Sequence, residues 1–354
     1  MRLPFERGHE QVHSFVDLFS GAGLLSYGLK AGGLQPVMSV ERCALASRSY
    51  RSNVADVVRT TDVGSTEALA DHPRARIVVA GPPCQGFSTL GRRDPADVRN
   101  AAGMALLPHV DAADPDVVLV ENVPPFLASV HWKRIANALR RRGYVIKTWT
   151  LDAADHGTAQ HRLRSFTIAT RNGIEIQRPT TSRLQSCRWA FEKPTDPHDP
   201  LAKETRPEGL AADRIATVPP CGDKRDIMRL RPDLCPPSWF AVGCQATDVW
   251  GRVNPDKPAN TVRCSFQNPS KGRYLHPVLN RVLTLREGAR LQGIPDELTF
   301  DGRRYPVARQ IGNGVPVPLA RAIGVSIAAA LNTYDVRSSA TSVTSGAAAQ
   351  STGS

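Results

Sequence analysis

The chain has 354 residues, of which 41% are hydrophobic, and a formal net charge of +12. This length and hydrophobic content exclude an intrinsically disordered chain and allow two domains of unequal size. The positive charge favours a polyanionic partner, although a basic protein can simply have a solvated basic surface.

Targeting signals and disulfides are not indicated. The first residues, MRLPFERGHE, lack the apolar segment of a secretory signal, and the seven cysteines show no paired CxxC spacing. The longest smooth apolar stretch, AIGVSIAAAL, is shorter than the roughly 20 residues that cross a membrane. We therefore expect a reduced, cytoplasmic protein without a membrane span.

Short apolar segments alternate with helical patterns through the first half of the chain. The predicted strands are residues 12–19, 36–40, 76–80 and 116–121, and the predicted helices are residues 24–32, 44–53 and 125–143. Such alternation is typical of βαβ units and predicts an α/β fold with a mostly parallel sheet.

The texture of the sequence changes after this first domain, which we assign to residues 1–177. Proline, arginine and polar residues dominate residues 178–280, which predicts a second, smaller and irregular domain. We expect residues 281–315 to return to the first domain and a helix over 316–333 to complete it. Residues 338–354 are rich in serine, alanine, glycine and threonine and predict a disordered tail.

A glycine-rich segment follows the first predicted strand. In DLFSGAGLLSYGLKAGG, residues 17–33, the side chain of Phe19 and the glycines Gly21 and Gly23 lie where a strand turns into a helix. Glycine lets the backbone approach a ligand closely while the helix N-terminus faces it. A simple tight turn is the alternative interpretation of these glycines.

Two acids follow the next strands. Glu41 comes about 20 residues after the glycines, the spacing at which an acid accepts hydrogen bonds from ribose hydroxyls. Asp62, in RTTDV, is placed to accept a hydrogen bond from an adenine amino group. For either acid alone, a surface carboxylate or a helix cap is the favoured interpretation. Together with the glycines they predict a nucleoside pocket.

A cysteine occupies a stiff loop after a later strand. In GPPCQGFS, Cys84 follows Pro82 and Pro83, whose fixed φ angles restrict where the thiol can lie. A lone cysteine is often only a small buried hydrophobe. Here the loop follows the carboxyl end of a strand, where open α/β sheets bind ligands, and Glu121 closes the next strand. A thiol and a carboxyl at one sheet edge can attack and protonate an electron-poor ring.

Six segments in order resemble the motif series of the bacterial DNA (cytosine-5) methyltransferases, over about residues 12–333. They are FSGAG, GPPCQGFS, ENV, QHRLR (160–164), RVLTLREGARLQGIPD (281–296) and RQIGNGVPVPLARAIG (309–324). The resemblance implies a Rossmann-like sheet that binds S-adenosylmethionine, with the smaller domain recognising the target sequence. It implies methyl transfer to C5 of a cytosine flipped out of duplex DNA.

The resemblance also implies roles for individual residues. Cys84 is the expected nucleophile that adds to C6, Glu121 is expected to hold N3 and the exocyclic amine, and Arg162 and Arg164 are expected to secure the base and the catalytic loop. The residues expected to line the S-adenosylmethionine pocket are Phe19, Gly21, Gly23, Glu41, Asp62, Pro82 and Asn313. The residues expected to contact DNA are Gln85, Ser88, Gln160 and Thr261.

Some positions depart from the family pattern. Arg42 follows the ribose-binding acid where the family often has an apolar or aromatic residue, and its guanidinium can stack on adenine or face water. Ile294 replaces a usual phenylalanine, which we interpret as packing. A zinc site of Cys221, Cys235, Cys244 and His276 is not favoured because the intervals are irregular, and we expect no metal.

We expect a monomer that acts on double-stranded DNA in the bacterial cytoplasm, in a restriction-modification system. One alternative keeps the chemistry and changes the substrate to RNA cytosine. A second alternative is a catalytically silent DNA-binding module that senses the cofactor. Such a module is expected to lack Cys84 or Glu121, and this sequence retains both.

Overall fold

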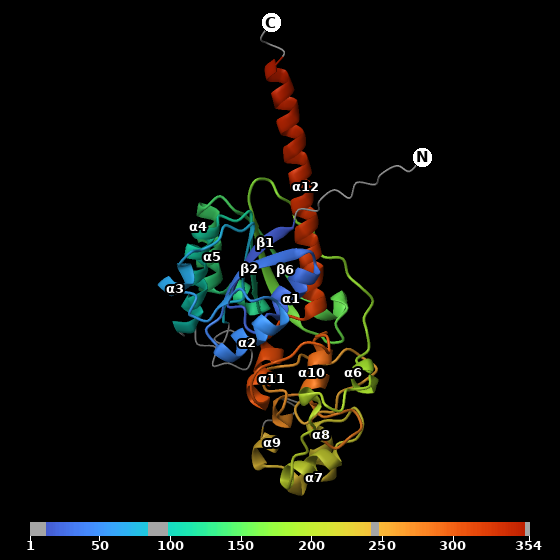
Figure 1. Cartoon of the computed structure of the whole chain (residues 1–354). Coiled ribbons are helices and arrows are strands. Elements are labelled where there is room, and N and C mark those ends of the chain that lie inside the picture. Colours follow the sequence, from blue (N-terminus) through green and yellow to red (C-terminus); the bar gives the residue numbers. More distant parts are fainter. Residues whose placement is uncertain (1–11, 84–97, 242–247, 351–354) are drawn as a thin grey trace, which may run out of the picture.

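The computed structural model of the chain describes residues 12–83, 98–241 and 248–350. The chain forms two lobes that lie end to end: a larger lobe built on a β-sheet and a smaller lobe of short helices and loops (Figure 1). The larger lobe contains the seven-stranded sheet, in the order β3-β2-β1-β4-β5-β7-β6. Its strands are β1 His13–Leu18, β2 Leu34–Val40, β3 Val58–Arg59, β4 Ile77–Ala80, β5 Val117–Asn122, β6 Val145–Asp152 and β7 Leu163–Thr170.

The predicted mostly parallel sheet is confirmed. Strands β1 to β5 pair in parallel, and β7 is antiparallel to both β5 and β6. The chain runs outward from β1 to β3 and then returns to place β4 on the other side of β1. The carboxyl ends of β1 and β4 therefore flank the point where the strand order reverses, which is where open α/β sheets bind ligands.

The sequence did not predict β6 and β7 as strands. In β6 most side chains are exposed or half-buried, whereas Trp149 and Leu151 are buried. This strand lies at the edge of the sheet, so only part of one face is covered. An edge strand with most side chains exposed or half-buried therefore lacks the continuous apolar run that marks the central strands.

Helices cover both faces of the sheet (Figure 1). On one face, α1 and α12 pack over a core that includes Phe15, Val79 and Leu119. On the other, α4 and α5 pack over a core that includes Val16, Val78 and Val118. The helices of this lobe are α1 Leu24–Ala31, α2 Ala44–Asn53, α3 Thr66–Leu69, α4 Leu106–Ala113, α5 Val130–Arg141 and α12 Val317–Gln350.

The helix predicted over residues 125–143 is divided. A 3₁₀-helix covers Pro124–Ala128, and α5 begins only at Val130. Ser129 separates the two, and its hydroxyl accepts a hydrogen bond from the backbone N–H of Trp132. This side-chain cap satisfies one of the free N–H groups at the start of α5.

Small residues bring α1 and α12 close together. A Cβ atom on Gly28 would come within 2.4 Å of Ala320 Cβ, and one on Gly32 within 2.8 Å of Gly324 Cα. The side chains Leu319, Ile323, Ile327 and Leu331 are fully buried and recur every four residues along α12. By length and composition Arg304–Ala340 is apolar enough to cross a membrane. Its buried stripe is what the core helix of a globular domain requires.

The segment predicted as a disordered tail follows directly on the predicted helix over 316–333. Residues 338–350 continue α12, which projects beyond the larger lobe (Figure 1). The composition of this segment indicated a lack of packing residues, but alanine has the highest helix propensity of any residue. A helix that is already nucleated and packed over its first turns can extend through such residues without tertiary contacts.

The smaller lobe contains six short helices among its described residues. They are α6 Trp189–Glu192, α7 Leu210–Thr217, α8 Lys224–Leu230, α9 Pro237–Ala241, α10 Leu285–Leu291 and α11 Arg304–Asn313. The helices α10 and α11 pack in a core that includes Leu201, Val253 and Phe266 of this lobe and also Leu24 of α1. The chain rejoins the sheet core only from Val315.

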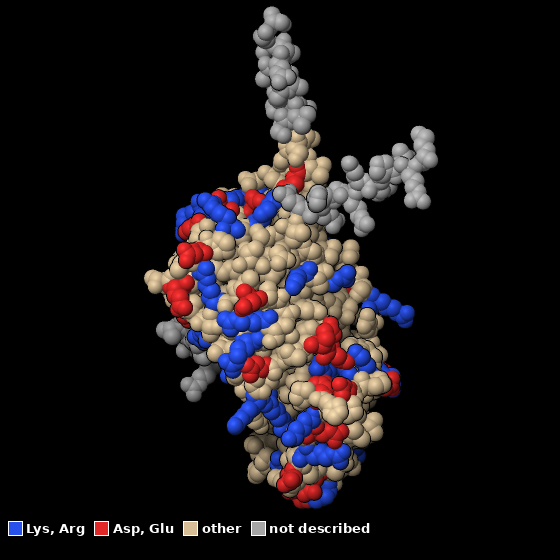
Figure 2. Space-filling model, viewed as in Figure 1, with Lys and Arg blue, Asp and Glu red and all other residues tan. Residues whose placement is uncertain are grey.

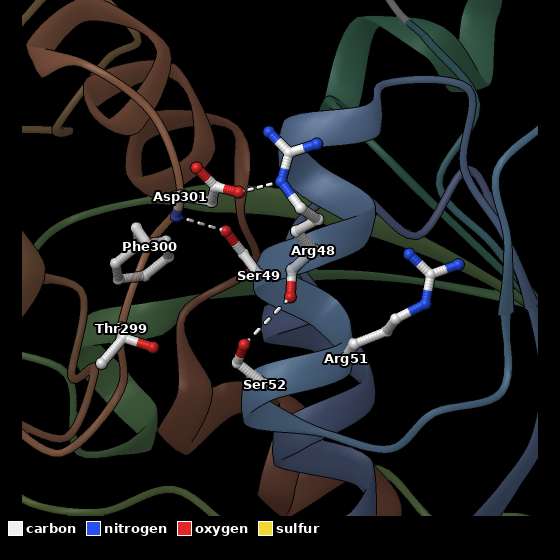
Figure 3. A pocket seen from close by; sticks show the side chains of 7 residues that line it. All are labelled: Arg48, Ser49, Arg51, Ser52, Thr299, Phe300 and Asp301. Atoms are coloured by element: carbon white, nitrogen blue, oxygen red, sulfur yellow. Dashed lines mark hydrogen bonds and ion pairs between the residues drawn. The ribbon is translucent and has the colours of Figure 1, made fainter.

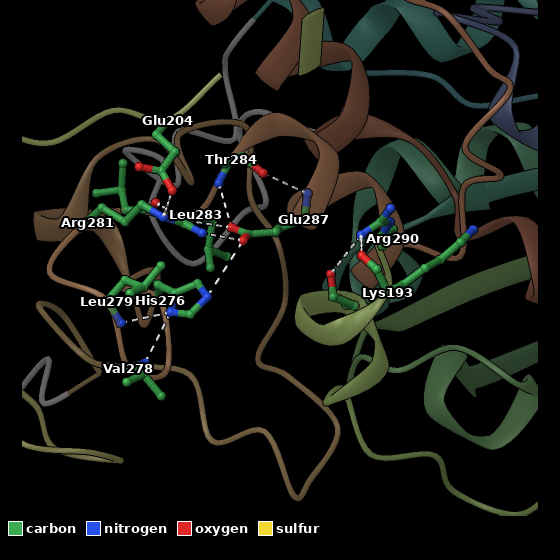
Figure 4. Close-up of polar contacts among 12 residues, drawn as sticks. Lys193, Glu204, His276, Val278, Leu279, Arg281, Leu283, Thr284, Glu287 and Arg290 are labelled. Atoms are coloured by element: carbon green, nitrogen blue, oxygen red, sulfur yellow. Dashed lines mark hydrogen bonds and ion pairs between the residues drawn. The ribbon is translucent and has the colours of Figure 1, made fainter. Parts of the chain in front are cut away.

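Buried polar groups hold part of the smaller lobe together (Figure 4). The guanidinium of Arg281 donates to both carboxylate oxygens of Glu287, at 2.8 and 2.7 Å. Thr284 and Glu287 form a reciprocal capping box at the start of α10. Burial lowers the pKa of His276 to about 4, so its neutral ring accepts hydrogen bonds from the N–H groups of Val278 and Leu279.

A second set of contacts joins α2 to the segment before α11 (Figure 3). Asn53 and Thr299 exchange two hydrogen bonds, Arg48 pairs with Asp301, and the Asp301 N–H donates to the Ser49 hydroxyl. Arg48, Ser49, Thr299 and Asp301 are among the residues that line a shallow hollow of about 400 Å³. They tie the two lobes together on the side of α2.

Candidate active site

The loop after β1 has an unusual backbone. Phe19, Gly21 and Gly23 all have positive φ angles, of 59°, 56° and 85°. Phe19 is a non-glycine residue in a conformation that side chains disfavour. A Cβ atom on Gly23 would come within 2.7 Å of the Tyr50 ring, whereas one on Gly21 would meet nothing within 4 Å. The loop is therefore packed beneath Gly23 and open at Gly21, as a backbone that receives a ligand requires.

Glu41 lies against this loop. One carboxylate oxygen accepts a hydrogen bond from the N–H of Gly21 at 2.9 Å, and the other accepts one from the N–H of Cys43 at 2.7 Å. Each oxygen has a second lone pair. The carboxylate is thus fixed at the carboxyl end of β2 and retains acceptor capacity for hydroxyl groups of a ligand.

Asp62 and Arg42 lie close to each other. A carboxylate oxygen of Asp62 accepts a hydrogen bond from the Gly64 N–H at 3.0 Å. The other lies 4.0 Å from a guanidinium nitrogen of Arg42, and both side chains are largely exposed. An exposed pair at this distance contributes little stability. Arg42 therefore faces Asp62 and solvent in this structure.

Glu121 lies within the same ligand-binding edge of the sheet. It forms an ion pair with Arg164, with 3.0 Å between Oε1 and Nε, and both side chains are only 14% exposed. A Cβ atom on Gly81 would lie 3.7 Å from Glu121 Oε2 and 4.0 Å from the Phe19 carbonyl oxygen. Gly81, directly after β4, thus lies between the Glu121 carboxyl and the loop after β1.

Burial raises the pKa of Glu121, although the positive charges of Arg164 and Arg162 oppose this effect. A buried carboxyl that takes up a proton more readily than usual can donate a hydrogen bond to a ring nitrogen as well as accept one. The neighbouring Asn122 amide donates a hydrogen bond to the Pro82 carbonyl at 3.2 Å.

The guanidinium of Arg162 is buried and bonds to backbone groups of the protein. Its guanidinium donates to the carbonyl oxygens of Val262 and Gly312, at 2.9 and 2.7 Å. Burial and the nearby Arg164 lower the pKa of Arg162 to about 9. Arg162 thus joins the start of β7 to the smaller lobe and to the end of α11, while Arg164 faces Glu121.

Gln160 is also buried rather than available at a surface. Its amide donates to the Leu291 carbonyl and the Gln292 side chain, and its oxygen accepts from the Val262 N–H. The side chain is 0% exposed, so in this structure it does not offer the predicted contact to DNA. The half-buried Thr261 hydroxyl donates to the His161 carbonyl at 2.8 Å.

The other predicted site residues divide into two groups. Asn313 is exposed at the end of α11, and its side-chain oxygen lies 2.6 Å from Cys264 Sγ. Cys84, Gln85 and Ser88 lie outside the described residues.

Asp17 is a candidate that sequence reasoning missed. It is 1% exposed within β1, and it accepts a hydrogen bond from the Ser26 hydroxyl at 2.6 Å. Ser26 in turn accepts one from the Tyr50 hydroxyl at 3.0 Å. Burial raises the pKa of Asp17 to about 7. The signal was an acid inside an otherwise apolar strand, two residues before the glycine-rich loop.

The described parts of the chain contain no candidate metal site. No group of three or more histidine, cysteine, aspartate or glutamate side chains there has a metal-binding arrangement. Cys221 and Cys235 are free thiols, and Cys244 lies outside the described ranges.

A mostly parallel sheet with a glycine-rich loop after β1, an acid after β2 and a largely buried acid near the end of β5 is typical of enzymes that bind a nucleoside cofactor. The family model for C-5 cytosine-specific DNA methylases matches residues 13–221 and 222–329. The chain therefore belongs to this family.

Two curated Type II methyltransferases are similar in sequence to most of this chain. The chain is 30% identical over 337 residues to Type II methyltransferase M1.HphI of Haemophilus parahaemolyticus, covering 89% of this chain and 86% of the relative. It is 26% identical to M.DdeI of Desulfomicrobium norvegicum, covering 89% and 88%.

The fold is similar to that of Entamoeba histolytica methyltransferase EhMeth, with a TM-score of 0.64 and 18% identity over 88% of this chain and 96% of the other. It is also similar to that of the S. pombe Dnmt2 methyltransferase, with a TM-score of 0.62 and 17% identity over 91% and 99%.

Proposed function

We propose that this protein transfers a methyl group from S-adenosylmethionine to C5 of a flipped cytosine in a specific duplex DNA sequence, through a covalent bond between Cys84 and C6. The observation that carries this proposal is the largely buried ion pair of Glu121 and Arg164, with Gly81 between Glu121 and the loop after β1. The Glu121 carboxyl, which can hold a proton, and the glycine-rich loop after β1 thus lie at the same edge of the sheet.

The described residues fit the cofactor. Gly21 is open on the side where a Cβ would be, and Glu41 retains lone pairs for ribose hydroxyls. Phe19, Gly23, Asp62, Pro82 and Asn313 are the further residues proposed to line its site. When bound, S-adenosylmethionine supplies an electrophilic methyl group.

The protein's own residues prepare the cytosine. The carbon C5 is a poor nucleophile until the Cys84 thiolate adds to C6 and makes the ring enamine-like. The Glu121 carboxyl stabilises the electron density that develops at N3, and Arg164 holds this carboxyl in place. Once C5 carries the methyl group, its proton passes to a base such as water, the C5–C6 double bond forms again, and the sulfur of Cys84 leaves C6 as the thiolate. This chemistry requires the base outside the duplex stack.

The smaller lobe is proposed to read the target sequence in the DNA grooves. On the face shown in Figure 2, acidic and basic side chains are interspersed over this lobe. Several of its arginines pair with acids two or three residues away, including Arg229 with Asp226 and Arg231 with Asp233. Arginines that are already paired contribute less to phosphate binding, so the phosphate contacts are expected from other basic groups and from Thr261, whereas the base contacts are expected from the smaller lobe.

The remaining expectations follow the Type II relatives. We propose that the protein acts as a monomer in the bacterial cytoplasm, on the DNA of a restriction-modification system. The RNA alternative uses the same chemistry on a different substrate. The alternative of a silent module requires loss of the thiol or the carboxyl, and the sequence keeps both Cys84 and Glu121.

Covalent trapping tests the proposed chemistry. Duplex DNA with 5-fluorocytosine at the target cannot lose a C5 proton, so wild-type protein with S-adenosylmethionine should form a denaturation-resistant adduct. Cys84→Ala should form none. Bisulfite sequencing of DNA from cells that express the protein identifies the target needed for the duplex. An adduct with Cys84→Ala would show that the nucleophile is wrong, and trapping of RNA in place of DNA would establish the RNA alternative.

A further inference from the structure

A buried acid lies directly beneath the loop proposed to bind the cofactor. Asp17 precedes Phe19 by two residues in β1, and its side chain is 1% exposed. The Ser26 hydroxyl at the start of α1 donates to one of its oxygens at 2.6 Å. The Tyr50 hydroxyl of α2 extends this chain by donating to Ser26 at 3.0 Å. The chain of hydroxyls connects Asp17 to the ring that packs under Gly23.

Among the residues that the structure describes, no positive charge faces Asp17. Its neighbours across the sheet are Ser39 on β2 and Val79 on β4. The titratable groups that face it are Glu41, at the end of β2, and Tyr50, from α2. Within the described ranges no lysine, arginine or histidine acts on its charge. A buried carboxylate without a cationic partner carries a large desolvation cost.

A cation bound on the loop would supply the missing partner. S-adenosylmethionine carries a positive sulfonium, and after methyl transfer the same sulfur is an uncharged thioether. The amino, carboxyl, ribose and adenine groups are common to both molecules. The charge at sulfur is therefore the property by which a buried acid beneath the loop can distinguish cofactor from product.

We propose that Asp17 is a positioning residue that discriminates cofactor from product: it is ionised while the sulfonium occupies the loop and takes up a proton from solvent when the thioether replaces it. This inference rests on the proposed use of S-adenosylmethionine. It gives the enzyme a preference for cofactor over product that depends on pH. Burial raises the pKa of Asp17 to about 7, and the negative charge of Glu41 adds to this effect, so the exchange of the proton occurs near neutral pH.

Titration calorimetry with both ligands tests the proposal. The dissociation constants of S-adenosylmethionine and S-adenosylhomocysteine are measured at pH 6, 7 and 8 for wild-type protein, Asp17→Asn and Ser26→Ala. In wild-type protein the ratio of the product constant to the cofactor constant should rise by about threefold to tenfold from pH 6 to pH 8, since a single linked proton allows at most about tenfold per pH unit. In Asp17→Asn the ratio should show only the pH dependence of the ligands themselves.

Two further readouts separate a linked proton from a structural effect. Repeating the wild-type titration in buffers of different ionisation enthalpy should show proton release with the cofactor and less with the product. Ser26→Ala removes the hydrogen bond that lowers the pKa of Asp17, so the pH midpoint should move upward while cofactor binding remains. Circular dichroism checks that each variant is folded.

The outcomes distinguish this inference from the proposed function. If wild-type protein binds the cofactor and Asp17→Asn keeps the wild-type dependence of the ratio on pH, the role of Asp17 is overturned while the proposed function stands. If Asp17→Asn does not fold, an unchanged midpoint in Ser26→Ala overturns the same role. If wild-type protein binds no S-adenosylmethionine at any pH, the proposed function fails and this inference fails with it.

Discussion

Replacing Asp17 by asparagine should stabilise the fold at neutral and alkaline pH. Burial raises the pKa of this carboxyl from 3.8 to about 7. In the unfolded chain Asp17 ionises near pH 4, whereas in the folded protein it keeps its proton until near pH 7. Between these values the unfolded state binds fewer protons, so this group lowers the free energy of unfolding as pH rises. The loss is complete above the folded pKa.

The size of the effect follows from the displacement of the pKa. One pKa unit corresponds to about 1.4 kcal/mol, so the wild-type protein loses at most about 4 kcal/mol at pH 8 through Asp17. Asparagine has no charge to bury and can still accept a hydrogen bond from Ser26. We expect Asp17→Asn to be more stable than wild-type protein by about 2–4 kcal/mol at pH 8, and by much less at pH 5.

Urea unfolding followed by circular dichroism at the two pH values measures this difference without ligand. Asp56→Asn is the matched control, because Asp56 is 85% exposed and its ion pair with Arg51 lies at the surface. This control should change stability little at either pH. The reasoning is refuted if Asp17→Asn and wild-type protein differ by the same amount at pH 5 and pH 8.

Two more substitutions test the site and the connection between the lobes. Glu41→Ala removes the acceptor of two backbone N–H groups and the proposed ribose ligand, so calorimetry should show cofactor binding weakened by about 1.5–3 kcal/mol; an unchanged dissociation constant would remove Glu41 from the site. Arg162→Met leaves the buried carbonyls of Val262 and Gly312 unpaired but also removes a buried charge, so the free energy of unfolding in urea should fall by about 1–3 kcal/mol. A variant as stable as wild-type protein would show that Arg162 is not a tie between the lobes.

The central sheet and the candidate site at its edge could be predicted from local sequence. Apolar runs identified β1, β2, β4 and β5, because strands buried on both faces are nearly continuous in hydrophobic residues. The position of Glu121 followed directly, since it stands at the end of such a run. The loop after β1 could also be predicted from its glycines, because glycine adopts the positive φ angles found at Gly21 and Gly23 without steric strain.

The tertiary structure alone decided which polar side chains are buried. Gln160 and Arg162 look like surface groups in QHRLR, but their partners lie about 100 residues or more away in the chain, including Val262 and Gly312. The core that α10 and α11 share with distant segments of both lobes has the same origin. Burial depends on which distant segments pack together, and no local pattern contains that information. Asp17 shows the consequence: its sequence marks it only as an acid in a strand, and its environment makes it titrate near neutral pH.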